Sequence, residues 1–195
     1  MKTVPERGIG HWLHHRGIRR VLLLVRIPVG LAVGVALVWL AQPTWFWAAA
    51  GVAFAGELLQ MWAAACLEKR KVFLPRGPYT LVRNPMYMGR FLVILGALGV
   101  LANPWVLLAF VLGFVPYVVG RVLREEKSLP EFFGEPYRAY AASVPRFLPF
   151  RLRPYRAGGP LWFFSWRMLV ENREHLNLMA VVSFFLVVGL RIALA

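Results

Sequence analysis

The sequence is poor in cysteine and in acidic residues. Cys66 is the single cysteine of the chain, which excludes an intrachain disulfide and a zinc site built from cysteines. Nine acidic residues stand against 23 lysines and arginines, so the formal net charge is +14. The basic residues lie between apolar stretches and do not follow one soluble face. We therefore expect anionic lipid headgroups, and not nucleic acid, as their partner.

The sequence also offers no convincing metal site. His11, His14 and His15 share one helical face near the N-terminus, but no carboxylate stands at a matching spacing. We interpret this region as a basic arm that lies on a membrane surface. The apolar run that follows is too long for the core of a signal peptide, which predicts a retained signal-anchor helix.

What the sequence has in abundance is apolar residues, which make up 59% of the chain and give a mean hydropathy of +0.58. This composition predicts an all-α integral membrane protein. About five segments are long enough, or nearly so, to cross a bilayer: Val21–Ala41, Trp45–Cys66, Met86–Ala102, Pro104–Gly120 and Leu176–Leu194. The third and fourth are short and are separated only by Asn103 and Pro104, which predicts a helical hairpin.

The distribution of basic residues predicts the orientation of these spans. The short turns at 42–44 and at 103 carry no lysine or arginine, whereas the N-terminal arm and the Glu68–Pro85 and Arg121–His175 segments carry nearly all of them. By the positive-inside rule, the N-terminus and these two segments are cytoplasmic, and five crossings place the C-terminus outside.

The chain has no internal repeat, so we interpret residues 1–195 as one domain. Its 151–195 part consists of an interfacial segment and the last transmembrane helix. In Arg151–Asn172, arginines alternate with tryptophan, tyrosine and phenylalanine, a pattern typical of the headgroup region. A second interpretation is that these aromatic residues roof a lipid-binding cleft.

Glu57 is the one acidic residue inside an apolar span. It lies about 16 Å along a helix from the charged end of that span, near the bilayer midplane. A carboxylate there is costly unless it is paired or protonated. Two interpretations remain open: a functional group, or a structural hydrogen bond through Gln60 or Arg26.

The run from Gly77 to Gly89 reads Gly-Pro-Tyr-Thr-Leu-Val-Arg-Asn-Pro-Met-Tyr-Met-Gly and leads directly into an apolar span. Two prolines fix the backbone and two glycines permit close approach. We interpret this run as a ligand cradle at the membrane surface.

A charged cluster follows the fourth span. A helix places Arg121 and Glu125 on one face, as a pair that by itself is worth only about 0.3–0.5 kcal/mol. The aromatic residues, glycine and prolines that follow, up to Pro149, predict that the chain returns to the membrane surface beside the cradle.

These two segments together resemble the isoprenylcysteine carboxyl methyltransferases and the related phosphatidylethanolamine N-methyltransferases. The family pattern of Gly-x-Tyr and Arg-His-Pro-x-Tyr-x-Gly, a hairpin, then Glu-Glu, Phe-Phe-Gly-x-x-Tyr and Val-Pro-x-x-Leu-Pro is matched by Gly77–Gly89 and Arg121–Pro149. One departure is Asn84, which replaces the histidine of the pattern. An amide can bind an adenosyl group but does not titrate near neutral pH, so Asn84 is not an acid or base.

The resemblance implies a small membrane enzyme with a cytoplasmic pocket for S-adenosylmethionine, built on a core of about 64–150. It implies that Arg121 faces the methyl acceptor and that Glu125 contacts the charged methionyl end of the cofactor. The implied cofactor-binding residues are Ala64, Lys71, Val72, Phe73, Leu74, Tyr79, Asn84, Pro85, Met86, Tyr87 and Glu125.

The acceptor is then a membrane lipid or a lipidated substrate, and isoprenylcysteine carboxyl methylation is the first expectation. Arg121 can orient a carboxylate without any base, whereas an amine or thiol acceptor must lose a proton, for which Glu126 or Glu57 is a candidate. Phospholipid N-methylation and thiol S-methylation therefore remain alternatives. A non-enzymatic alternative is a small transporter or lipid-binding protein that uses Glu57 and Arg121.

Overall fold

The computed structural model describes residues 16–68, 73–150 and 153–194, and within these ranges all regular structure is helical. Three helical stretches in this part of the chain are long and apolar enough to cross a membrane: Pro43–Cys66, Pro104–Phe133 and Glu174–Ala193. Pro28–Leu40 and Pro85–Gly99 are apolar but shorter. The all-α membrane fold is confirmed, while the number of five crossings stays a prediction.

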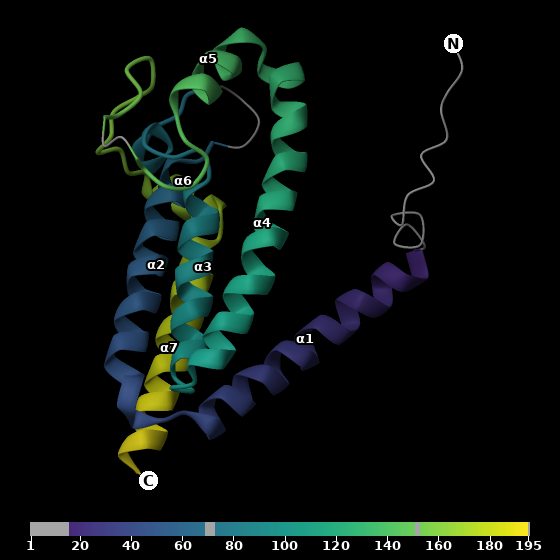
Figure 1. Cartoon of the computed structure of the whole chain (residues 1–195), viewed down its shortest axis with the longest axis vertical. Coiled ribbons are helices and arrows are strands. Elements are labelled where there is room, and N and C mark those ends of the chain that lie inside the picture. The colour runs from purple at the N-terminus through teal and green to yellow at the C-terminus, as the bar shows by residue number, and fades with distance from the viewer. Residues whose placement is uncertain (1–15, 69–72, 151–152, 195) are drawn as a thin grey trace.

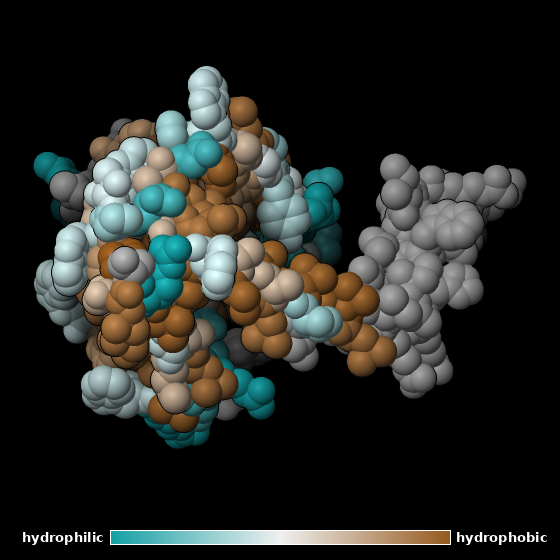
Figure 2. Space-filling model, turned by 90° about the horizontal axis from the view of Figure 1, so that it is seen from below, coloured by the Kyte–Doolittle hydropathy of each residue, from teal (hydrophilic) through white to brown (hydrophobic). Residues whose placement is uncertain are grey.

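The long helices form a bundle with one helix that diverges from it. The bundle consists of α2 (Phe46–Cys66), α3 (Pro85–Gly99), α4 (Pro104–Phe133) and α7 (Glu174–Ala193). In Figure 1, α2, α3 and α7 run together, α4 leans outward from α3, and α1 (Arg16–Leu40) slants away from them all. Figure 2 shows a largely hydrophobic surface on this projecting helix.

The tight packing of α2 on α3 depends on small residues. A Cβ atom added to Gly96 would lie 2.5 Å from the carbonyl oxygen of Ala49, and one added to Gly89 would lie 2.7 Å from the carbonyl oxygen of Gly56. These backbones therefore touch directly, as small residues allow between membrane helices. The contact runs along both helices, since Gly89 meets the middle of α2 at Gly56 and Gly96 meets its first turn at Ala49.

The predicted hairpin is present, but its second helix is longer than the sequence suggested. Asn103 caps α4, since its side-chain oxygen accepts hydrogen bonds from the backbone of Trp105 (3.0 Å) and Val106 (3.4 Å). The expected span ended at Gly120, whereas α4 continues to Phe133 and ends at Gly134, which has a φ of 64°. Arginine, glutamate and lysine are good helix formers, so the charged cluster extends the helix and does not end it.

Three short elements gather at the end of the bundle opposite to the C-terminus (Figure 1). They are the short 3-10 turn η3 (Gly77–Thr80), α5 (Glu135–Ser143) and α6 (Trp166–Glu171). The backbone N–H of Arg83 donates to the carbonyl of Pro145 (2.8 Å), and that of Asn84 donates to the carbonyl of Arg146 (3.1 Å). The prediction that the second motif returns beside the cradle is therefore confirmed.

Candidate functional site

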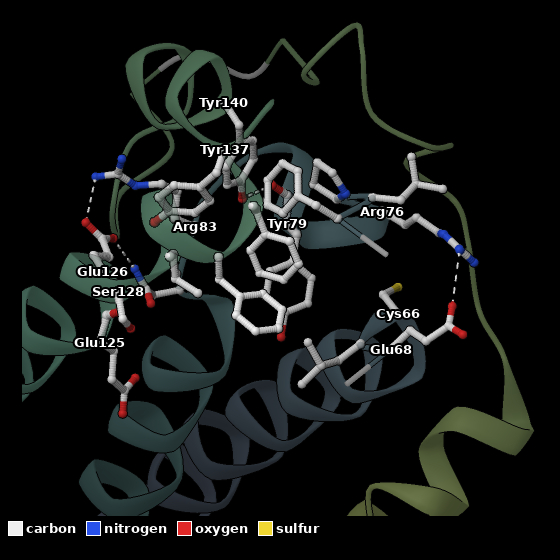
Figure 3. Close-up of a pocket in the computed structure, with 18 residues that line it drawn as sticks. Cys66, Glu68, Arg76, Tyr79, Arg83, Glu125, Glu126, Ser128, Tyr137 and Tyr140 are labelled. Carbon is white, nitrogen blue, oxygen red and sulfur yellow. Dashed lines mark hydrogen bonds and ion pairs between the residues drawn. The ribbon is translucent and has the colours of Figure 1, made fainter. Parts of the chain in front are cut away.

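A cavity of about 800 Å³ lies between the last turns of α4, the C-terminal end of α2 and the loop that precedes α3. Its size is within the range of small-molecule sites. In Figure 3, the pair of Arg83 and Glu126 lies on one side of it and the pair of Arg76 and Glu68 on the other, with aromatic rings between them.

The aromatic wall is centred on Phe73. Its ring centroid lies 5.3 Å from that of Phe133, 5.4 Å from Tyr137 and 5.2 Å from Tyr140. The Tyr140 hydroxyl donates to the backbone carbonyl of Tyr79 at 2.7 Å. Burial raises the pKa of both Tyr79 and Tyr140 above the ordinary value, so both hydroxyls stay protonated at neutral pH. The wall is thus an uncharged surface of rings.

Glu126 connects three segments on one side of the cavity. Its carboxylate accepts hydrogen bonds from Asn84 Nδ2 (3.1 Å) and from Arg146 Nε (2.9 Å), and Arg83 Nη2 lies 3.2 Å away. The side chains of Glu126 and Arg83 are only 11% and 9% exposed. This arrangement joins α4, the cradle and the returning segment through charge-assisted bonds, which are the strong class of hydrogen bond.

Glu125 belongs to a second, more exposed group. Arg121 Nε donates to Glu125 Oε1 (2.9 Å) and to the Tyr87 hydroxyl (2.8 Å), and that hydroxyl lies 3.0 Å from both Glu125 oxygens. Glu125 lines the cavity, but Arg121 and Tyr87 do not. Glu125 therefore stands at the border between the cavity and the apolar part of α4.

The opposite side of the cavity is held by the C-terminal segment. Arg76 lies 3.6 Å from Glu68 and also sits over the ring of Phe163, at 4.7 Å from its centroid. The N–H of Gly77 donates to the carbonyl of Pro160 (3.0 Å), and the N–H of Tyr155 donates to the carbonyl of Thr80 (3.0 Å). Residues after 152 thus support the cradle from behind.

Gly77 is where the cradle needs a glycine. Its φ is 55°, in the left-handed region, and an added Cβ atom would collide with Cys66 Sγ. The cradle can therefore approach the end of α2 only with glycine at this position, as its sequence predicted.

The structure brings together only part of the predicted site. Of the predicted residues, the cavity is lined by Phe73, Leu74, Tyr79, Asn84, Glu125 and Glu126. The predicted residues that do not line it are Ala64, Pro85, Met86, Tyr87 and Arg121. Lys71 and Val72, like the three N-terminal histidines, lie outside the described residues. The predicted pairing of Arg121 with Glu125 is confirmed.

Sequence reasoning missed the larger part of the lining. The additional lining residues are Cys66, Leu67, Glu68, Pro75, Arg76, Arg83, Ser128, Leu129, Phe132, Phe133, Tyr137 and Tyr140. Most belong to the quoted motifs or stand next to them, so their position in the motif was a usable signal. The direction of their side chains could not be predicted from the sequence, because it depends on how α4 and α5 pack.

Glu57 is buried within the bundle and does not line the cavity. Gln60 Nε2 donates to its Oε2 at 3.3 Å, so Gln60 is a partner as the structural interpretation expected, but the bond lies within α2 and does not reach a neighbouring helix. The Arg26 side chain lies outside the described part. Within the part of the chain that the structure describes, Glu57 Oε1 has no hydrogen-bond partner, so the structural role accounts there for one of its two oxygens.

Comparison with known proteins places the chain among membrane methyltransferases. Residues 29–136, more than half of the chain, match the model of the phospholipid methyltransferase family. A protein-S-isoprenylcysteine O-methyltransferase of Xenopus laevis is 39% identical over 74 residues, which cover 38% of this chain and 26% of that protein. The same-named protein of Schizosaccharomyces pombe is 33% identical over 95 residues, which cover 49% of this chain and 40% of that protein.

A further relative is protein-S-isoprenylcysteine O-methyltransferase B of Arabidopsis thaliana, which is 32% identical over 83 residues, 43% of this chain and 42% of that protein. The match spans less than half the length of each of these relatives. No solved structure matches the chain. The matched region contains the cradle, the hairpin and the Glu125–Glu126 pair, and the family match covers most of the described helical core, so the chain belongs to the phospholipid methyltransferase family.

Proposed function

We propose that this protein transfers a methyl group from S-adenosylmethionine to the carboxylate of a lipophilic acceptor of the isoprenylcysteine type. The observation that carries the choice of acceptor is the state of the acidic residues. Among the described residues, those that line the cavity are Glu68, Glu125 and Glu126, and each already accepts from, or lies within ion-pair distance of, an arginine. None is a free base for an amine or thiol, whereas a carboxylate acceptor needs none.

The residues of the cavity fit the donor. Flat aromatic faces suit a purine, and the ring cluster around Phe73 supplies them. Glu125, at the edge of the cavity, suits the cationic methionyl end. The amide nitrogen of Asn84 is already used by Glu126 and by the carbonyl of Arg146, which leaves its side-chain oxygen to accept from the adenosyl group.

The chemistry asks the protein mainly for positioning. When bound, S-adenosylmethionine supplies an electrophilic methyl group on a sulfonium. Because the sulfonium and the acceptor carboxylate carry opposite charges that would cancel during transfer, the chain would need only to position the two groups and to exclude water. Arg121 lies on the α4 face next to Glu125, where it can hold the acceptor carboxylate beside the cavity.

The setting of the reaction completes the proposal. The proposal puts the cavity and the N-terminus in the cytoplasm and the C-terminus outside, with five crossings in one domain, and the concentration of basic residues in the loops beside the cavity supports this orientation. Anionic headgroups pair with the arginines of the 151–172 segment. In a Cys66→Ala background, a cysteine at Thr44 should react with a membrane-impermeant reagent from outside and one at Gly134 should not. The reverse labelling pattern would contradict this orientation, because it would put the cavity outside the cell.

The central experiment is a methyl-transfer assay with purified protein in nanodiscs, using S-adenosylmethionine labelled on the methyl group. N-acetyl-S-farnesylcysteine should be labelled with a methyl ester, which alkali releases as methanol. Phosphatidylethanolamine should not be labelled; if it were N-methylated, the label would resist alkali. Alkali-stable label in the phospholipid would replace carboxyl methylation by N-methylation.

Two variants separate donor from acceptor. Glu125→Ala should weaken S-adenosylmethionine binding about ten- to a hundredfold, since a charge-assisted bond is worth about 1.5–3 kcal/mol. Arg121→Ala should keep that affinity within a few-fold while transfer falls about a hundredfold. If calorimetry shows no heat of cofactor binding to folded wild-type protein, the methyltransferase proposal is excluded, and a lipid-binding or transport role is favoured.

A further inference from the structure

A stripe of polar side chains continues from the cavity along α4 towards its apolar part. Tyr117, Arg121 and Glu125 follow each other at intervals of four residues, so they lie on one helical face about 6 Å apart along the axis. Tyr117 is 56% exposed, although the stretch around it is strongly apolar. The stripe thus leads from the border of the cavity into the membrane-facing surface.

The guanidinium of Arg121, in the middle of this stripe, is held by hydrogen bonds on both of its sides. On the cavity side, its Nε donates to the Tyr87 hydroxyl and to Glu125. On the apolar side, its Nη1 donates to the Tyr117 hydroxyl in a longer contact of 3.4 Å. Two anchor points fix the plane of the group, while its side chain stays 50% exposed. The remaining N–H groups are then available in a fixed orientation.

We infer that Tyr117 is a positioning residue for the methyl acceptor, because its hydroxyl orients Arg121 towards the acceptor carboxylate. The inference rests on the proposed function. A carboxylate pairs best with two parallel N–H groups in the guanidinium plane, so rotation of that plane weakens binding. Without the tyrosine hydroxyl, the plane is held from the cavity side alone. Tyr117 precedes the Arg121–Pro149 motif, and no other step of the proposed reaction uses it.

The test compares Tyr117→Phe with the wild type in the methyl-transfer assay. The variant keeps the ring and removes the hydroxyl. We expect the KM for N-acetyl-S-farnesylcysteine to rise about three- to tenfold, a modest effect because the lost bond to the guanidinium is long, at 3.4 Å. The kcat should stay within about twofold, and the Kd for S-adenosylmethionine should not change. Ser143→Ala removes a hydroxyl that donates within α5 to the carbonyl of Ala139 (2.9 Å), at a residue that does not line the cavity; it is the control and should change none of these values.

A second readout separates orientation from general damage. A farnesyl thioether that ends in an alcohol, and so lacks the carboxylate, should inhibit the wild type and Tyr117→Phe equally. An equal loss of affinity for both compounds, or an unchanged KM, would overturn the inference while the proposed function stands. A wild-type protein that labels no carboxylate acceptor would remove the proposed function and the inference with it.

Discussion

Replacing Glu126 by glutamine tests whether this carboxylate supports the structure or takes part in the reaction. The variant keeps the shape of the side chain and removes the negative charge that Arg83 and Arg146 share. Arg146 is 49% exposed and can turn to solvent, but Arg83 is only 9% exposed. The substitution therefore leaves one guanidinium group nearly buried without a counter-charge.

The expected cost follows from that burial. Removing one partner of a buried ion pair costs about 3–5 kcal/mol. Glutamine can still accept one hydrogen bond from an arginine, which lowers the expected loss to about 2–4 kcal/mol. For a chain of this size, such a loss lowers the midpoint of thermal unfolding by about 4–16 °C.

The neighbouring glutamate is the matched control. Glu125 and Arg121 are 48% and 50% exposed, and an exposed pair contributes about 0.2–1 kcal/mol. Glu125→Gln should therefore lower the unfolding midpoint by at most about 4 °C. Both variants make the same Glu→Gln change, at neighbouring positions. The difference between their unfolding midpoints therefore reports the environment of the carboxylate alone.

The measurement is tryptophan fluorescence during heating in detergent, since the chain has eight tryptophans. A double variant, Arg83→Met with Glu126→Leu, removes both charges. It should be less destabilised than the sum of its single variants by at least about 1 kcal/mol, because the two residues are in contact. Methyl transfer is assayed in parallel at a temperature at which Glu126→Gln is folded.

One result would refute the structural role of Glu126. If Glu126→Gln unfolds at the temperature of the wild type, binds S-adenosylmethionine normally and still transfers methyl groups a hundredfold more slowly, the carboxylate acts in the chemical step. The acceptor would then be one that must lose a proton, and carboxyl methylation would give way to amine or thiol methylation.

Three further predictions concern packing, capping and pH. Gly96→Val should destabilise the bundle by about 2 kcal/mol or more, because its Cβ would meet the backbone of α2, whereas Gly30→Val, with nothing within 4 Å, should be nearly neutral. Asn103→Ala should cost about 1 kcal/mol as the loss of an N-cap. Burial raises the pKa of Tyr140 above its value in the unfolded chain. The contribution of the protonated hydroxyl to the stability of the folded protein is therefore complete below about pH 10 and is lost as the pH rises further. The unfolding midpoint should be constant between about pH 7 and 9 and fall above about pH 10, and Tyr140→Phe should flatten that fall.

The features that the sequence predicted well are those with local causes. The hairpin depends on Asn103 and Pro104, which stand next to each other and begin a helix by themselves. The pairing of Arg121 with Glu125 follows from the helical repeat. Glycine at position 77 precedes Pro78 in a short turn that approaches Cys66 closely, and the positive φ there confirms that the turn needs a glycine.

The features that could not be predicted depend on how distant segments pack. Glu126 contacts Arg83, which precedes it in the sequence, and Arg146, which follows it. No spacing rule connects these three residues. The length of α4 was underestimated for a different reason. Hydropathy marks where apolar residues end, at Gly120, but backbone hydrogen bonds do not depend on polarity, and the helix ends only where Gly134 breaks it.

The C-terminal segment, which lies beyond the family match, supports the other wall of the cavity at the end of α2. The last carbonyl groups of a helix have no partner within it and must find one elsewhere. At the end of α2, Asn172 donates to the carbonyls of Ala64 (2.9 Å) and Leu67 (3.0 Å), and the N–H of Ser165 donates to that of Ala65 (3.2 Å).

The two walls are thus held by different forces. The wall around Glu126 depends on a nearly buried ion pair, whereas the wall at the end of α2 depends on neutral hydrogen bonds to the backbone and on the more exposed pair of Arg76 with Glu68. Because salt screens exposed charges more than buried ones, high salt should weaken the Arg76–Glu68 pair more than the Arg83–Glu126 pair. The α4 side of the cavity, from which the stripe leads to Arg121, should therefore keep its buried ion pair at high salt.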